Sequence, residues 1–94
     1  MSTTHNTTFK PHVDIESKVL DGEAVLLNVA TGAYFNLNEV GTCIWESFRK
    51  GHAISKVIDL VCEEYDIDRR QAEADVCDLT TRLIDEHLLT PTND

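Results

Sequence analysis

The chain has 94 residues, which is enough for one small domain with a single hydrophobic core. Its 8 basic and 17 acidic residues give a formal net charge of -9, which works against binding to nucleic acid because that charge repels a polyphosphate backbone. A hydrophobic fraction of 41% is typical of a globular protein, and no apolar run is long enough to cross a membrane. We therefore expect a folded cytoplasmic protein with neither nucleic acid nor membrane as a partner.

The two ends of the chain are predicted to be tails. Residues 1–11 show neither periodicity nor the apolar stretch of a secretory signal, so they predict a flexible N-terminal segment that ends where Pro11 stiffens the chain. The folded domain is predicted over residues 12–90. Residues 91–94, which begin with Pro91, are predicted to be a short C-terminal tail.

Apolar and charged side chains alternate from residue 13 onward. Val13, Ile15, Ser17 and Val19 fall on one face, which is the period-two pattern of a strand with one buried side. Asp21-Gly22 follows directly and predicts a tight turn.

Two further strands are predicted before residue 38. One spans Glu23–Val29, and a turn at residues 30–32 leads to the other, over residues 33–37. The side chains that share a face are Val25, Leu27 and Val29 in the first of these strands, and Phe35 and Leu37 opposite Tyr34 and Asn36 in the second. The first third of the chain thus predicts a three-stranded antiparallel meander.

The apolar period changes from two to about 3.6 at Asn38, a residue type favoured at helix N-caps. A first helix is predicted from there to about Lys50, and Gly51 ends it. A second helix begins at Ser55 or just before it, because its apolar positions recur at helical spacing.

The third predicted helix is the longest and spans about Arg69–Glu86. Asp68, followed three residues later by Gln71, predicts a capping box at its start. Three strands followed by three helices, without strand–helix–strand alternation, predict an α+β fold in which helices cover one face of a small sheet.

No catalytic or metal-binding constellation is apparent in the sequence. The four histidines are isolated from one another, the three cysteines lack a Cys-x-x-Cys pair, and the carboxylates near residue 65 lack the order of a calcium loop. The residues concerned are His5, His12, His52, His87, Cys43, Cys62, Cys77, Glu63, Glu64, Asp66 and Asp68. We therefore predict no enzymatic activity, no cofactor, no metal site, and reduced cysteines that are mostly buried.

Several segments between Asp21 and Leu89 carry a family resemblance. They are GEAVLLN at 22–28, TGAYFNLNEVG at 31–41, IWE at 44–46, VIDL at 57–60, EYDID at 64–68, ADV at 74–76 continuing through Leu83, and Leu88-Leu89. These segments resemble the PqqD-like family, the recognition elements of pathways that modify ribosomally synthesised peptides. The resemblance implies a winged helix-turn-helix fold with three strands and then three helices, which is the order that periodicity predicts.

The resemblance also implies a function. Such domains capture the leader segment of a precursor peptide as an added strand beside their third strand and the third helix, and present it to a modifying enzyme such as a radical SAM protein, cyclase or protease. Transferred by position, the peptide-binding residues are expected to be Ala33, Tyr34, Phe35, Asn36, Leu37, Asp75, Val76, Leu79, Arg82 and Leu83.

Two places depart from the subgroup that serves pyrroloquinoline quinone synthesis, in which an Arg-Gly pair precedes the second strand and a Tyr-Pro-Glu-like turn follows it. Asp21-Gly22 and residues 28–31 occupy these places here, which leaves open a lasso-peptide, radical-enzyme or other pathway. Two alternative functions are an interaction subunit that binds a folded partner enzyme without peptide, and a winged-helix DNA-binding protein whose recognition helix begins at Arg69 and Arg70.

Overall fold

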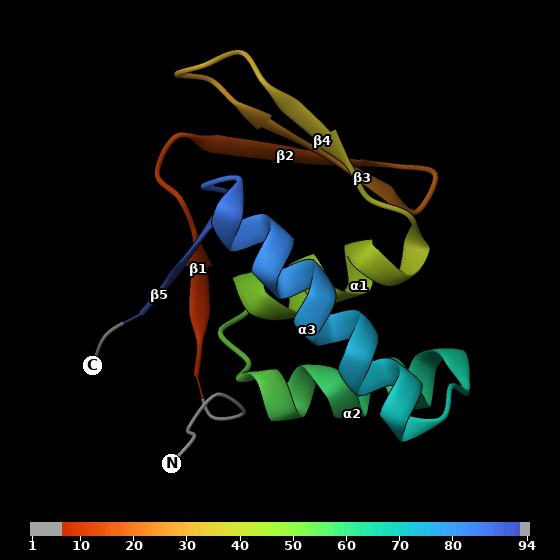
Figure 1. Ribbon diagram of the computed structural model, residues 1–94. Helices are drawn as coiled ribbons and strands as arrows, with labels where there is room; N and C mark the ends of the chain where they lie inside the picture. The colour runs from red at the N-terminus through yellow and green to blue at the C-terminus, as the bar shows by residue number, and fades with distance from the viewer. Residues whose placement is uncertain (1–6, 93–94) are drawn as a thin grey trace.

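The computed structural model describes residues 7–92 and has the predicted order of three strands and three helices, with an additional strand at each end (Figure 1). The elements are β1 (Phe9–Pro11), β2 (Ile15–Leu20), β3 (Glu23–Asn28), β4 (Tyr34–Asn36), α1 (Glu39–Arg49), α2 (Ile54–Tyr65), α3 (Arg69–Asp85) and β5 (Leu89–Pro91). The antiparallel sheet has the order β2-β3-β4, and the three helices pack beneath it. This confirms the predicted α+β, winged-helix-like arrangement.

The second sheet, in which β1 pairs with β5, departs from the predicted tails at residues 1–11 and 91–94. Phe9–Pro11 runs antiparallel to Leu89–Pro91 beside the helices (Figure 1). Phe9 is 5% exposed, and its ring meets that of Phe48 edge-on with 5.2 Å between centroids. Burial of this aromatic ring offsets the entropy lost on ordering a short segment. The tail predicted for residues 1–6, with His5, and for residues 93 and 94 lies outside the described residues.

The pairing register decides which face of the sheet is buried. Ala24 and Leu26 are fully buried on the inner face of β3, whereas Leu27 is 38% exposed on the outer face. The apolar face predicted for this strand, which carries Val25, Leu27 and Val29, is therefore the outer one. β2 also begins later than predicted, because Val13 lies in a turn and is 88% exposed.

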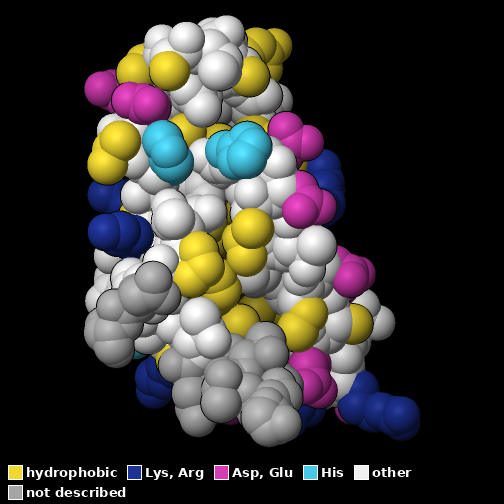
Figure 2. All heavy atoms as spheres, turned by 60° about the vertical axis from the view of Figure 1, so that its left-hand side comes forward, with side chains coloured by type: hydrophobic (Ala, Val, Ile, Leu, Met, Phe, Trp, Pro, Cys, Tyr) yellow, Lys and Arg dark blue, Asp and Glu magenta, His cyan; other side chains and the backbone are white. Residues whose placement is uncertain are grey.

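Exposed large hydrophobic side chains occur on this sheet and its turns, and none occurs on a helix of the described chain. They are Val13, Val19, Leu20, Leu27, Val29 and Tyr34. Hydrophobic side chains are accordingly visible at the top of Figure 2, where the sheet lies. The helices instead turn their apolar residues into a core that contains Trp45, Phe48, Leu26, Ile44, Ile54, Ile58, Leu83, Val57, Val61 and Val76.

The helix starts follow the predicted capping residues. The Asn38 side chain accepts a hydrogen bond from the Gly41 backbone N–H at 2.8 Å, which caps α1. Asp68 caps α3 by accepting from the Arg70 N–H at 3.2 Å. The predicted capping box does not close, because Gln71 donates to Asp75 one turn further on.

Candidate functional site

The outer edge of β4 is open. Leu37 N–H donates to the Ala24 carbonyl at 2.8 Å, and Asn28 N–H donates to the Ala33 carbonyl at 2.9 Å. In an antiparallel ladder, successive residues direct their main-chain groups alternately toward and away from the partner strand. Ala33, Phe35 and Leu37 therefore face β3, whereas Tyr34 and Asn36 direct N–H and C=O groups to the free edge. Within residues 7–92, no strand pairs with this edge.

A groove runs between this open edge and α3. Its larger hollow, of about 390 Å³, has an apolar floor to which β4, the first turns of α1 and Leu79 contribute. Carboxylates and one arginine of α3 line the same hollow. The lining residues are Phe35, Asn36, Leu37, Asn38, Val40, Gly41, Ile44, Asp75, Asp78, Leu79 and Arg82.

A second hollow, of about 240 Å³, continues the groove toward the C-terminal end of α3. Phe35 lines both hollows, so the two adjoin at this residue. The start of β4 lies beside the end of α3 and the end of β4 beside the middle of α3, so strand and helix run in opposite directions along the groove. The second hollow is lined by Asn28, Thr31, Ala33, Tyr34, Phe35, Asp85, Glu86, His87 and Leu88.

Arg82 and Phe35 meet at the junction of the two hollows. The guanidinium carbon of Arg82 lies 5.0 Å from the centroid of the Phe35 ring, within the range of a cation–π interaction. This contact joins α3 to β4 across the groove. Arg82 itself is exposed, so its remaining N–H groups face solvent at the groove rim.

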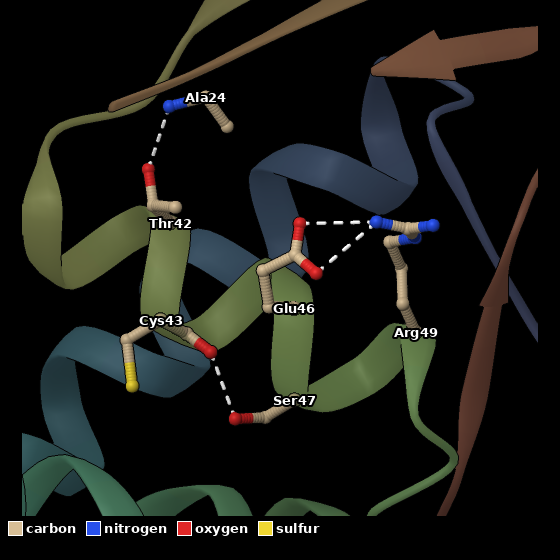
Figure 3. A network of polar contacts seen from close by, with 6 residues as sticks. All are labelled: Ala24, Thr42, Cys43, Glu46, Ser47 and Arg49. Atoms are coloured by element: carbon tan, nitrogen blue, oxygen red, sulfur yellow. Dashed lines mark hydrogen bonds and ion pairs between the residues drawn. The ribbon is translucent and has the colours of Figure 1, made fainter. Parts of the chain in front are cut away.

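A buried hydroxyl holds the edge strand against α1. Thr42 of α1 is 8% exposed, and its Oγ1 accepts a hydrogen bond from the Ala24 N–H at 2.8 Å (Figure 3). The same hydroxyl donates to the Leu37 carbonyl at 3.4 Å. The Thr42 side chain therefore links α1 to the start of β3 and to the residue after β4. This link holds in place the segments of β4 and α1 that line the larger hollow.

The turn before β4 is held by Asn28. Its side-chain oxygen accepts from the backbone N–H groups of Ala30 at 2.9 Å and Thr31 at 3.2 Å. Gly32 has a φ of 81°, a conformation that disfavours residues with a side chain. Together these features set the register in which Tyr34, 69% exposed, enters the edge strand.

Eight of the ten residues predicted to bind peptide line one of the two hollows. Val76 and Leu83 do not, because both are fully buried in the core beneath α3. Sequence reasoning missed Asp78, although it lies three residues after Asp75 and four before Arg82, spacings that place all three on one helix face. The prediction also missed the part of the floor formed by Asn38, Val40, Gly41 and Ile44.

Cysteine thiols and groups of possible metal ligands are the remaining candidates for chemistry among the described residues. All three cysteines are free thiols and only partly buried, where the sequence predicted mostly buried ones. Burial raises the pKa of the Cys43 and Cys77 thiols above its ordinary value, so both are protonated and weakly nucleophilic at neutral pH. Among residues 7–92, no group of three or more His, Cys, Asp or Glu side chains is arranged to hold a metal ion. Over the same residues, no helix has both the length and the apolar character to span a bilayer.

Comparisons with known proteins find one matching family and two similar structures. Residues 23–89 match the family described as coenzyme PQQ synthesis protein D (PqqD). The structure is similar to that of TbiB1 in complex with the TbiA(beta) leader peptide, with 35% identity, a TM-score of 0.82, and coverage of 90% of this chain and 99% of that one. It is also similar to a lasso peptide synthetase B1 complexed with the leader peptide, with 29% identity, a TM-score of 0.81, and coverage of 88% and 98%. No curated protein sequence matches the chain significantly.

Proposed function

This chain belongs to the PqqD family, and on that premise we propose that it is a non-catalytic domain that binds the leader segment of a ribosomally synthesised precursor peptide. The leader adds as a strand to the open edge of β4 and packs against α3. The domain then presents the precursor to a modifying enzyme, such as a radical SAM protein, cyclase or protease, in the cytoplasm. The observation that carries this proposal is the unpaired edge of β4 beside a groove with an apolar floor and a charged wall.

The two similar structures support the choice of ligand. Both are described as complexes with a leader peptide, and this chain covers nearly the whole of each. A peptide that pairs with β4 would reach the outward N–H and C=O groups of Tyr34 and Asn36. Strand addition of this kind takes affinity from the main chain and selectivity from pockets for alternate side chains.

Main-chain pairing alone would bind such a peptide weakly. Each hydrogen bond contributes about 0.5–1.5 kcal/mol net, whereas ordering the backbone of each peptide residue costs roughly 1–2 kcal/mol. The apolar floor formed by residues such as Phe35, Leu37 and Leu79 supplies the difference. Burying two or three large apolar leader side chains contributes roughly 1.5–3 kcal/mol each, which brings the complex toward the micromolar range.

Charge and ion pairing weigh against the DNA-binding alternative. Arg69, which would begin a recognition helix, forms an ion pair with Asp59. The groove side of α3 carries Asp75 and Asp78, which repel phosphate. The other alternative, an interaction subunit that binds a folded enzyme without peptide, leaves the edge of β4 and the groove unused.

The test replaces one main-chain donor at the open edge. Short reading frames beside this gene supply the candidate precursors, and peptides that correspond to the N-terminal halves of these precursors are synthesised. Their binding to the protein is measured by calorimetric titration. Asn36→Pro removes an N–H that faces the free edge and leaves the β3–β4 ladder intact. Asn36→Ala is the matched control, because it removes the same side chain and keeps the N–H.

We expect Asn36→Pro to weaken peptide binding by about threefold to tenfold or more, the equivalent of one main-chain hydrogen bond plus local misfit, and Asn36→Ala to change it little. Circular dichroism and thermal melting establish that both variants fold. Equal binding by the parent and a folded Asn36→Pro variant would refute strand addition at β4. Binding of the partner enzyme alone, with no binding of any peptide, would favour the folded-partner alternative.

A further inference from the structure

The charges along the groove are unevenly distributed. Four carboxylates of α3 and its C-cap line the two hollows, with Asp75 and Asp78 in the larger one and Asp85 and Glu86 in the smaller one. All eight Lys and Arg residues of the chain lie within the described range, and of these only Arg82 lines either hollow. The groove wall therefore has an excess of three negative charges.

These carboxylates are not neutralised within the domain. The Arg49–Glu46 and Arg69–Asp59 ion pairs and the contact between His12 and Asp14 all lie outside the groove. Asp75 accepts one hydrogen bond from the neutral Gln71 side chain at 2.8 Å, and within residues 7–92 the carboxylates of Asp78, Asp85 and Glu86 form no side-chain hydrogen bond or ion pair. A peptide that fills the groove would thus displace water from carboxylates that have no cationic partner.

We infer that the leader segment recognised by this chain is cationic, with two Lys or Arg side chains that flank an apolar anchor and lie against the Asp75–Asp78 and Asp85–Glu86 pairs. This inference rests on the proposed function and specifies the class of peptide that the groove selects. Arg82, between the two pairs, disfavours a third basic residue at the centre of the segment.

The helix geometry sets the spacing of the two basic residues. The middle of the Asp75–Asp78 pair and the middle of the Asp85–Glu86 pair are nine positions apart, which at about 1.5 Å per residue corresponds to about 13–14 Å along α3. An extended peptide covers about 3.3 Å per residue, so four residues cover about 13 Å. Residues four apart in a strand also point to the same side, so both basic side chains face α3 when they occupy positions i and i+4.

The test begins with a selection that contains no assumption about the peptide. Phage-displayed random 15-residue peptides are selected on the full 94-residue chain, and the recovered sequences are aligned. The tightest peptides are then synthesised with a fluorescent label, in their selected form and with each Lys or Arg changed to Gln. Dissociation constants follow from fluorescence anisotropy at low and high salt.

Two variants with the same net charge separate local recognition from overall attraction. Asp78→Asn combined with Asp85→Asn removes one carboxylate from each hollow, and both residues are exposed, so the fold is retained. Glu63→Gln combined with Glu64→Gln removes two exposed carboxylates from α2, outside both hollows. The second variant is the control for the change in net charge.

We expect the recovered peptides to be enriched in basic residues at two positions four apart. Exchange of either basic residue for Gln should weaken binding by about twofold to fivefold, and more at low salt than at high salt. The Asp78→Asn/Asp85→Asn variant should weaken binding of the basic peptide similarly and reduce the effect of the Gln exchanges, because one carboxylate remains in each hollow, whereas the α2 control should change affinity less than twofold.

Different results would contradict the charge inference and the proposal of strand addition. If peptides are recovered whose binding is lost in Asn36→Pro, but which show no basic enrichment and no response to the Gln exchanges, the charge inference is wrong and strand addition stands. An equal effect of the α2 control and the groove variant would also overturn the inference. If no peptide is recovered, or the recovered peptides bind Asn36→Pro as well as the parent, both proposals are wrong.

Discussion

Thr42→Val tests whether one buried hydroxyl holds the groove together. Valine has nearly the shape of threonine, so the change removes the hydroxyl with little change in volume. In the parent protein this hydroxyl accepts from the Ala24 N–H at 2.8 Å and donates to the Leu37 carbonyl at 3.4 Å. Ala24 is fully buried, so water cannot replace the lost acceptor.

The expected loss of stability follows from this unsatisfied amide. A buried donor left without a partner costs about 1–3 kcal/mol. In a domain of about this length, each kcal/mol lowers the melting temperature by about 4–8 °C. We therefore expect Thr42→Val to melt roughly 4–24 °C below the parent, and to bind peptide more weakly because the end of β4 at Leu37 loses its link to α1.

Urea unfolding and amide hydrogen exchange measure the effect. Thr42→Ser is the matched control, because it keeps the hydroxyl and loses only a methyl group worth about 0.8 kcal/mol. Exchange at the Ala24 amide should accelerate in Thr42→Val and stay slow in Thr42→Ser. If Thr42→Val unfolds at the urea concentration of the parent and its Ala24 amide remains protected, then the hydroxyl does not stabilise the junction of β3, β4 and α1.

Three further perturbations test other parts of the structure. Phe9→Ala should lower the free energy of unfolding by about 3–5 kcal/mol, because it empties a buried site between β1 and α1; urea unfolding with no change would show that residues 9–11 do not belong to the folded domain. Burial raises the pKa of the Cys43 and Cys77 thiols above 9.0, so the folded state holds these protons more tightly than the unfolded chain. The stability that they contribute is complete below pH 9.0 and is lost as the pH rises through the folded pKa values, so the melting temperature should fall above pH 9.0 and fall less in Cys43→Ala/Cys77→Ala. Asp66 ends α2 with a φ of 52° and a ψ of 48°, so Asp66→Gly should raise the stability by about 0.5–1 kcal/mol and Asp66→Ala should not; equal melting curves for the two variants would argue against backbone strain at this position.

The sequence alone predicted the elements whose signals are local. Alternation over residues 33–37 indicated a strand with Tyr34 and Asn36 on one face, and the structure leaves both exposed. Asn38 and Asp68 predicted the starts of α1 and α3, because a capping side chain bonds to backbone groups only two or three residues away. Interactions between residues only two or three positions apart depend on the local sequence, so the sequence alone predicts them.

The tertiary structure decided what depends on distant segments. The β1–β5 pair joins residues about 80 positions apart through two three-residue strands, which are too short to show a period. β3 carries apolar side chains on both faces, so only the helices that pack on Ala24 and Leu26 determined which face is buried. The groove likewise combines β4, the start of α1 and one face of α3. Val76 and Leu83 of α3 are fully buried, whereas Asp78 and Leu79 of the same helix line the hollow, because burial along α3 depends on how the helix is rotated against its neighbours.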